Sequence, residues 1–275
     1  MDLDAASGLP TFTERSGHEK NSEVTSALAP HGYIQDFLNR DVAAKLGSGA
    51  RVLDIGCGRG EGVAWLLGQG YDAYGTDVSP EYLERGRTYL ATNGHDPNRL
   101  RVAVDDGRSY PFADQSFDAV VSNQVIEHVP DLDSFAKETA RVSAPGAAGL
   151  HICPARWRPL EVHMRIPLVH WLPKGRTRAA AIGVGLRLGF AGSYFPDLAL
   201  ADRRDIFSEF STQQTFYRPA TEILRTFERH GTVADLTESS RRKLRWHGVP
   251  EPFAGAGARI YPHALSLVLH TVQLG

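Results

Sequence analysis

The spacing of apolar residues becomes regular at about residue 33. Over residues 33–46 apolar side chains recur every three or four positions, which is typical of one face of a helix. The members of this stripe are Tyr33, Ile34, Phe37, Leu38, Val42 and Leu46. Glycines at positions 47 and 49 are expected to end the helix. Residues 1–30 are polar and rich in Ser, Gly, Pro and His, so we expect a mobile arm or lid there.

Short apolar runs then alternate with helical patterns along most of the chain. Strands are expected at residues 51–55, 72–77, 101–105, 117–122, 149–153, 232–236 and 265–272. Helices are expected at about 61–69, from Ser79-Pro80 onward, at 132–142 and at 219–229, and a turn is expected at Pro145-Gly146. Strands that alternate with helices are typical of a doubly wound sheet. The sequence therefore predicts an α/β, Rossmann-like fold with a seven-stranded, mostly parallel sheet.

The alternation is interrupted after residue 153. Residues 154–216 contain many of the prolines and tryptophans and a Gly/Ala-rich apolar stretch at 179–192. A structureless loop of this length is uncommon inside a compact domain, so we expect a partly helical insertion after the fifth strand. Residues 217–275 are expected to complete the sheet.

Composition excludes several classes of protein. The chain has 275 residues, with 30 Lys and Arg against 32 Asp and Glu, a net charge of −2. No nucleic-acid partner is expected, because a large basic excess is absent from the sequence. Two cysteines, Cys57 and Cys153, are too few for a disulfide framework and favour a reducing compartment. No apolar run reaches about 18 residues, so no membrane span is expected and we predict a cytoplasmic location.

A glycine-rich turn follows the first expected strand. It contains Asp54 and then Gly56, Gly58 and Gly60. Glycines at this spacing let the backbone turn sharply and approach a ligand, which also meets the free amides at a helix start. The dinucleotide fingerprint Gly-x-Gly-x-x-Gly fails here, because its last position holds Glu61 or Val63.

Carboxylates end the next two expected strands. Asp77 ends the second, where a carboxylate can accept both ribose hydroxyls of a nucleotide. Asp105 and Asp106 end the third, where a carboxylate can accept a hydrogen bond from an adenine amine. The simpler alternative is that these acids are helix caps and turn residues.

In order and spacing, these motifs resemble those of the class I S-adenosylmethionine-dependent methyltransferases. VLDIGCGRG resembles their glycine loop, TDVSP their ribose-binding turn, and DDGRSYPFADQSFDAVVSNQVIEHVPD their third and fourth strand ends. The resemblance covers roughly residues 50–153 and implies S-adenosylmethionine, and not NAD, as the cofactor. The cofactor-binding residues that it implies are Asp54, Gly56, Cys57, Gly58, Asp77, Val78, Asp106, Gly107, Asn123 and Gln124. Asp54 is expected near the cofactor's amino group, Asp106 and Gly107 beside its adenine.

The resemblance also suggests a division of labour along the chain. Residues 31–153 form the cofactor-binding half, and the 154–216 insertion covers a small-molecule acceptor. Methyl transfer mainly requires alignment of donor and nucleophile, but a weakly acidic hydroxyl also needs a base. We favour an oxygen acceptor, with His163, His128 and Glu127 as catalytic candidates and His170 and Tyr217, around the insertion, as further ones. Each histidine could instead be structural.

The segment NQVIEHVPD further resembles the O-methyltransferases of ubiquinone biosynthesis. In those proteins a Glu, a second Glu three residues later and the next His can bind a divalent metal. Glu127 and His128 match two of these positions, but Gln124 replaces the first carboxylate and is a poor ligand for a hard cation. We therefore predict no metal.

Charge within the insertion bears on the acceptor. Residues 155–216 hold nine Arg and Lys against five Asp and Glu. This excess indicates an acceptor with an acidic or phosphate group and an apolar part, although a solvated face would have the same composition. Two other functions stay open: a carbon or nitrogen methyltransferase acting on a metabolite, and a cofactor-binding protein without catalysis.

Overall fold

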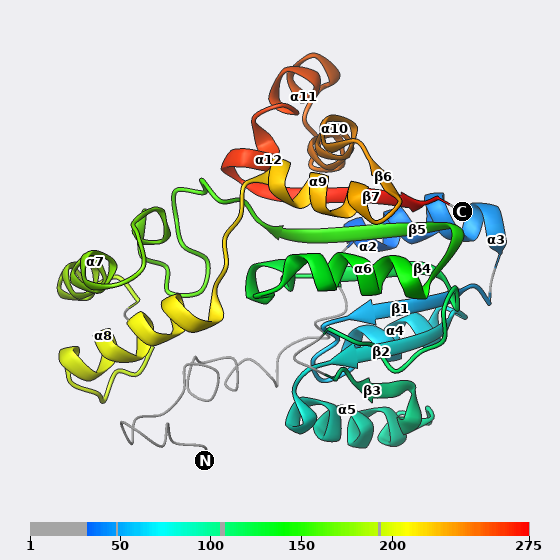
Figure 1. Cartoon of the computed structure of the whole chain (residues 1–275), viewed down its shortest axis with the longest axis horizontal. Coiled ribbons are helices and arrows are strands. Elements are labelled where there is room, and N and C mark those ends of the chain that lie inside the picture. The colour runs from blue at the N-terminus through cyan, green and yellow to red at the C-terminus, as the bar shows by residue number, and fades with distance from the viewer. Residues whose placement is uncertain (1–31, 48, 105–107, 192–193, 275) are drawn as a thin grey trace.

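The computed structural model describes residues 32–47, 49–104, 108–191 and 194–274. The expected arm and the predicted adenine contacts Asp106 and Gly107 lie outside these residues. A seven-stranded sheet of order β3-β2-β1-β4-β5-β7-β6 forms the centre (Figure 1). β1 to β5 run parallel, and β7 is antiparallel to both of its neighbours. The predicted fold class is confirmed.

All seven expected strands are present. They are β1 Arg51–Ile55, β2 Asp72–Asp77, β3 Leu100–Val102, β4 Phe117–Asn123, β5 Ser143–Pro154, β6 Thr232–Ala234 and β7 Ser266–Gln273. The turn expected at Pro145-Gly146 is wrong, because β5 runs through both residues. Gly146 has φ +81°, and the register against β4 shifts between Phe117 and Ala119, so the two residues form an irregularity within a longer strand.

Helices cover both faces of the sheet and continue beyond it. The α-helices are α2 Gly32–Phe37, α3 Ala44–Leu46, α4 Glu61–Gly68, α5 Pro80–Thr92, α6 Leu132–Val142, α7 Arg176–Arg187, α8 Leu200–Glu209, α9 Ala220–Arg229, α10 Leu236–Trp246, α11 Glu251–Gly257 and α12 Tyr261–Ala264. Shorter turns of other helix types are η1 Leu38–Ala43, η2 Pro97–Arg99, η4 Ile126–His128, η5 Val169–Trp171 and η6 Phe210–Gln214. Sequence analysis missed α10. Asp235 caps its start by accepting the N–H groups of Thr237 and Glu238, which also ends β6 earlier than expected.

The first helical stripe is interrupted by a π-helical turn. η1 joins α2 to α3, and a π turn holds more residues than an α turn. The phase of the stripe therefore changes, and Leu46 is 54% exposed, whereas Tyr33, Phe37, Leu38 and Val42 are buried. The expectation that Leu46 shares the buried face is wrong.

Two apolar cores lie on opposite faces of the sheet. Val52 and Leu53 are adjacent in β1, and both are fully buried, one in each core. The first core includes side chains of α2, α4 and α5, and the second includes side chains of α6 and α9. Burial on both faces explains why β1 has a continuous apolar sequence.

The segment that follows β5 has a core of its own. Side chains of α7 and α8, among them Ile182, Leu186 and Phe207, pack with Met164 and Ile166 in a third cluster. Figure 1 shows α7 and α8 beyond the end of the sheet at which β1 and β5 finish. The segment is partly helical, as expected.

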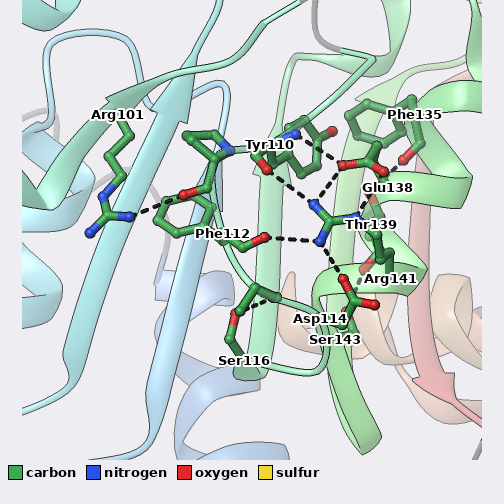
Figure 2. Close-up of polar contacts among 12 residues, drawn as sticks. Arg101, Tyr110, Phe112, Asp114, Ser116, Phe135, Glu138, Thr139, Arg141 and Ser143 are labelled. Carbon is green, nitrogen blue, oxygen red and sulfur yellow. Dashed lines mark hydrogen bonds and ion pairs between the residues drawn. The ribbon is translucent and has the colours of Figure 1, made fainter.

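An arginine in α6 fixes the segment that follows the predicted adenine contacts (Figure 2). Arg141 forms an ion pair with Glu138 at 2.8 Å and another with Asp114 at 2.6 Å, and it donates to the carbonyls of Tyr110 and Phe112. Glu138 also accepts the N–H of Tyr110 at 2.9 Å. The chain from residue 110 to 114 is thus tied to the sheet face covered by α6.

Among the described residues, no helix is long and apolar enough to cross a membrane.

Candidate active site

The glycine turn lies at the carboxyl end of β1. Gly56, Gly58 and Gly60 have φ values of +72°, +53° and +73°, where a side chain is strained. A Cβ atom on Gly56 would lie 2.4 Å from Val125, and one on Gly60 would lie 2.7 Å from Leu100. A Cβ on Gly58 would meet no described atom within 4 Å. Gly56 and Gly60 are therefore required by packing, whereas Gly58 exposes backbone to open space that a ligand could fill.

Asp77, at the end of β2, holds this turn in place. One carboxylate oxygen accepts the N–H of Gly58 at 2.8 Å, and the other accepts the N–H of Ser79 at 2.9 Å. Each oxygen keeps a further lone pair for a ligand hydroxyl. The next residue, Val78, is 57% exposed, which leaves its side chain available to an apolar ligand surface.

Asp54 lies against the start of α4. A Cβ atom on Gly62 would lie 2.5 Å from a carboxylate oxygen of Asp54. Burial, followed by the negative charges of Asp77 and Glu61, raises the pKa of Asp54 to about 7. The arrangement favours a cationic partner for this carboxylate, because a positive charge beside it would stabilise the ionised form.

Cys57 contributes differently from its neighbours in the turn. A Cβ atom on Gly75 would lie 2.6 Å from the Cys57 sulfur, so the side chain packs against β2. Burial raises the pKa of this thiol well above its ordinary value. Cys57 is 7% exposed, so little of its side chain is available to a ligand.

The end of β4 completes this group of residues. Gln124 follows Asn123 with φ +59°, an unusual value for a residue other than glycine, and its N–H donates to the carbonyl of Ile152 at 2.8 Å. Val125 then packs against Gly56. The fold thus brings the predicted residues of β1, β2 and β4 to one edge of the sheet.

Glu127, His128 and His163 form a second group. Glu127 is 2% exposed, and neither carboxylate oxygen has a hydrogen-bond partner within the described part of the chain. Burial raises the pKa of Glu127 to about 7. His128 places Nδ1 2.7 Å from the carbonyl oxygen of Gln214, and burial, followed by the charge of His163, lowers the pKa of His128 to about 4. Neutral His128 donates from Nδ1 to that carbonyl, which leaves Nε2 as an acceptor.

His163 is oriented by a buried carboxylate. Its Nδ1 lies 2.8 Å from Glu161 Oε1 and 3.2 Å from the Tyr217 hydroxyl oxygen. Glu161 also accepts the N–H groups of His163 and Met164 and the Tyr217 hydroxyl, at 2.8, 2.6 and 2.5 Å. Burial raises the pKa of Glu161, but hydrogen bonding and the charge of His163 outweigh it, and the pKa is lowered overall. Sequence analysis missed Glu161, whose one signal was its position two residues before a candidate histidine.

The two histidine rings lie close together. Their centroids are 4.8 Å apart, with a 68° angle between the ring planes. One potential ligand atom from each of Glu127, His128 and His163 lies within 4.8 Å of the others. This set could hold a divalent cation, and its third member comes from the segment after β5, not from Gln124. His170, by contrast, is buried beside Tyr217, at 4.8 Å between ring centroids.

A glycine turn and strand-end carboxylates on a sheet of this order define a Rossmann-like nucleoside-binding domain. Comparison with known proteins shows which class of nucleoside-binding domain this is. Residues 53–150 match the family described as "Methyltransferase domain". A chloroplastic protein of Oryza sativa named as a probable tocopherol O-methyltransferase is 40% identical over 97 residues, which are 35% of this chain and 26% of that protein. The ubiquinone biosynthesis O-methyltransferase of Sinorhizobium fredii is 32% identical over 132 residues, 46% of this chain and 51% of that protein.

Solved structures agree with this result at the level of the fold. Phosphoethanolamine N-methyltransferase 2 of Haemonchus contortus, in complex with S-adenosyl-L-methionine, superimposes with a TM-score of 0.52 at 17% identity, over 89% of this chain and 53% of that chain. Residues 53–150 are therefore part of a methyltransferase domain, and the predicted class I S-adenosylmethionine-dependent methyltransferase is confirmed at the level of this domain. The matches span between 26% and 51% of the length of the two curated relatives.

Proposed function

We propose that the protein transfers a methyl group from S-adenosylmethionine to an oxygen atom of a small molecule, with His163 accepting the proton of the acceptor hydroxyl. The observation that carries this proposal is the hydrogen bond between His163 Nδ1 and the buried Glu161. A carboxylate at this position selects the tautomer with the proton on Nδ1. Nε2 then carries the lone pair that a general base needs, and Glu161 stabilises the imidazolium once the proton is transferred.

The residues of the glycine turn fit the cofactor. Asp77 is proposed to accept ribose hydroxyls, Asp54 to lie near the amino group, and the backbone of Gly58 to border the methionine part. Gly56, Cys57, Val78, Asn123 and Gln124 complete the proposed contacts, with Asp106 and Gly107 at the adenine. The cofactor supplies the activated methyl group, and these residues hold it in line with the acceptor.

Substitution of His163 tests the base. We expect His163→Ala to lower the turnover number about 10²-fold or more, while affinity for S-adenosylhomocysteine changes little. The assay is release of S-adenosylhomocysteine over a library of hydroxylated metabolites, with the methylated atom identified by NMR. His247→Ala is the control, because His247 is an exposed histidine that directly follows α10. Turnover within threefold of wild type in His163→Ala would exclude His163 as the base, and methylation of carbon or nitrogen would refute the oxygen assignment. Absence of turnover with every acceptor would favour a cofactor-binding protein without catalysis.

A metal-assisted reaction is the second candidate. It is favoured by the two carboxylate oxygens of Glu127, which lack partners among the described residues, and by the two histidines beside them. A divalent cation held by Glu127, His128 and His163 would lower the pKa of a bound hydroxyl. Loss of turnover on chelation, with recovery on adding Mg²⁺, Mn²⁺ or Zn²⁺, would support this candidate over the metal-free prediction. Turnover unaffected by chelation would support the metal-free reaction with His163 as the base.

The proposal includes an acidic or phosphate group on the acceptor. A cytoplasmic location stays a prediction.

A further inference from the structure

A cavity of about 370 Å³ lies beside the proposed base and is lined by four cations. They are Arg156, Lys174, Arg178 and Arg218. Phe216 and Tyr217 supply aromatic walls, and no Asp or Glu is among the described residues that line it. The cavity is formed by the segment after β5 and by the chain between η6 and α9.

Three of the cations, Arg156, Lys174 and Arg178, form no ion pair within the described part of the chain, although the charge of Glu161 acts on Arg178. Arg178 is only 5% exposed, and its guanidinium donates to the carbonyls of Leu172 and Ser211 and to the Ser211 hydroxyl. Arg156 donates to the carbonyl of His170. Each of these acceptors is neutral, so the hydrogen bonds hold the side chains in place without cancelling their charge.

The other two cations add to the positive charge. Lys174 donates to the carbonyl of Thr212 at 2.6 Å and lies 4.3 Å from the centre of the Phe216 ring. Arg218 donates to backbone carbonyls, and its nearest carboxylate, that of Glu222, is 3.5 Å away. Burial and the neighbouring arginines lower the pKa of Lys174, which is the effect expected where like charges gather.

Buried cations are normally paired with carboxylates, because an uncompensated charge is costly away from water. Of the four cations only Arg178 is buried, and the charge of Glu161 acts on it, while Glu222 pairs with Arg218 at 3.5 Å. Arg156 and Lys174 form no ion pair with a described carboxylate, so the cavity keeps an excess of positive charge that an anion would complete. Arginine and lysine N–H groups bind carboxylate and phosphate oxygens with strong, charge-assisted hydrogen bonds.

Tyr217 connects this cavity to the proposed base. Its ring lines the cavity, and its hydroxyl oxygen lies 3.2 Å from His163 Nδ1 and donates to Glu161. Phe216, also in the cavity wall, donates its N–H to the carbonyl of Glu127 at 2.6 Å. A molecule anchored in the cavity would therefore contact Tyr217 and Phe216, which are hydrogen-bonded to the candidates His163 and Glu127.

We infer that this cavity binds the carboxylate or phosphate group of the methyl acceptor and so selects anionic acceptors. The inference rests on the proposed function for the identity of the ligand, but anion binding can be measured without methyl transfer. The shared chemistry is an oxyanion, and comparison of phosphate with acetate distinguishes the two sources.

The binding test uses calorimetric titration of the full chain with inorganic phosphate and, separately, with sodium acetate. We expect one of the two to bind wild-type protein, and Lys174→Gln and Arg156→Gln each to weaken that binding about tenfold or more. Both substituted residues are at least partly exposed, so the variants are expected to fold, which thermal unfolding checks. Arg187→Gln is the matched control, because Arg187 is an exposed cation of α7 outside the cavity lining. Binding of neither anion, or equal binding by all variants, would overturn the inference.

A second arm connects the cavity to catalysis. For an acceptor that turns over, we expect its methyl ester or amide to lose kcat/KM about tenfold or more in the wild type, and the difference to shrink in Lys174→Gln. An equal preference in both proteins would refute acceptor selection by this cavity, even if the His163 assignment holds. Anion binding together with full activity of His163→Ala would instead refute only the assigned base.

Discussion

Asp77 holds the glycine turn and has a second, proposed role as ribose ligand, and its substitution should separate the two. Its carboxylate accepts the N–H groups of Gly58 and Ser79, at 2.8 and 2.9 Å, and is also the proposed ribose ligand. In Asp77→Ala both N–H groups lose a charged acceptor. A hydrogen bond to a charged group contributes about 1.5–3 kcal/mol, but water can replace part of it at this half-buried position. We therefore expect the free energy of unfolding without cofactor to fall by about 1–3 kcal/mol, while the protein stays folded.

The loss of the proposed ribose contacts should have a second, separate effect on cofactor affinity. We expect affinity for S-adenosylhomocysteine to fall by about 2–3 kcal/mol, which is roughly 30- to 150-fold. Asp77→Asn keeps one acceptor oxygen but turns an amide donor toward one of the two N–H groups, so its stability should also fall. Urea unfolding gives the first quantity and calorimetry the second.

Glu84→Ala, which removes a carboxylate exposed on α5, is the control and should change neither quantity. Unchanged cofactor affinity in folded Asp77→Ala would refute the ribose assignment. Unchanged stability would instead show that the two backbone hydrogen bonds do not hold the turn.

Two further predictions concern the same turn. Positive φ values should make both Gly58→Ala and Gly60→Ala lose stability, but Gly60→Ala should lose more, about 1–3 kcal/mol, because its added Cβ also meets Leu100. Gly58→Ala should in addition weaken cofactor binding. Equal losses of stability, measured by urea unfolding, would contradict the assignment of open space to Gly58. Because the pKa of Asp54 is raised to about 7, a cationic amino group beside it must displace a proton at lower pH. Affinity for S-adenosylmethionine should therefore rise as pH increases from about 5 to 7, by at most about tenfold per pH unit, and calorimetry should show a flatter profile in Asp54→Asn. A profile that is the same in both proteins would place the amino group elsewhere.

The sheet could be predicted because its strands are buried on both faces. Val52 and Leu53 belong to opposite cores, and such strands appear as short apolar runs between recognisable turns and caps. Two local errors have physical causes that the pattern does not contain. Pro145 and Gly146 look like a turn, but they form an irregularity within β5, which pairs with β4 at Ser143 before them and with β4 and β7 from Ala148 onward. Leu46 leaves its stripe because a π turn changes the helix phase.

The candidate site was predictable only where its residues are close in sequence. Asp54, Gly58 and Asp77 lie within one strand–helix–strand unit, whose geometry is regular enough to place them together. Of the two partners of His163, Glu161 lies two residues away but carries no motif of its own, and Tyr217 lies 54 positions away. Tyr217 and Glu161 are separated by 56 positions and meet through a fold that no local pattern encodes.

The second group of residues joins two parts of the chain that are distant in sequence. The turn η4 receives three contacts from the chain at 214–218. The carbonyl of Gln214 accepts from His128, Phe216 donates to the carbonyl of Glu127, and Arg218 donates to the carbonyl of Ile126. The same short stretch also carries Tyr217, which contacts His163, and it lines the cationic cavity. A change in the cavity wall can therefore alter the position of both histidines, since the backbone of one segment supports the cavity on one side and η4 on the other. Acceptor preference and turnover should for this reason change together when residues 214–218 are substituted, whereas cofactor affinity depends on the glycine turn and should not.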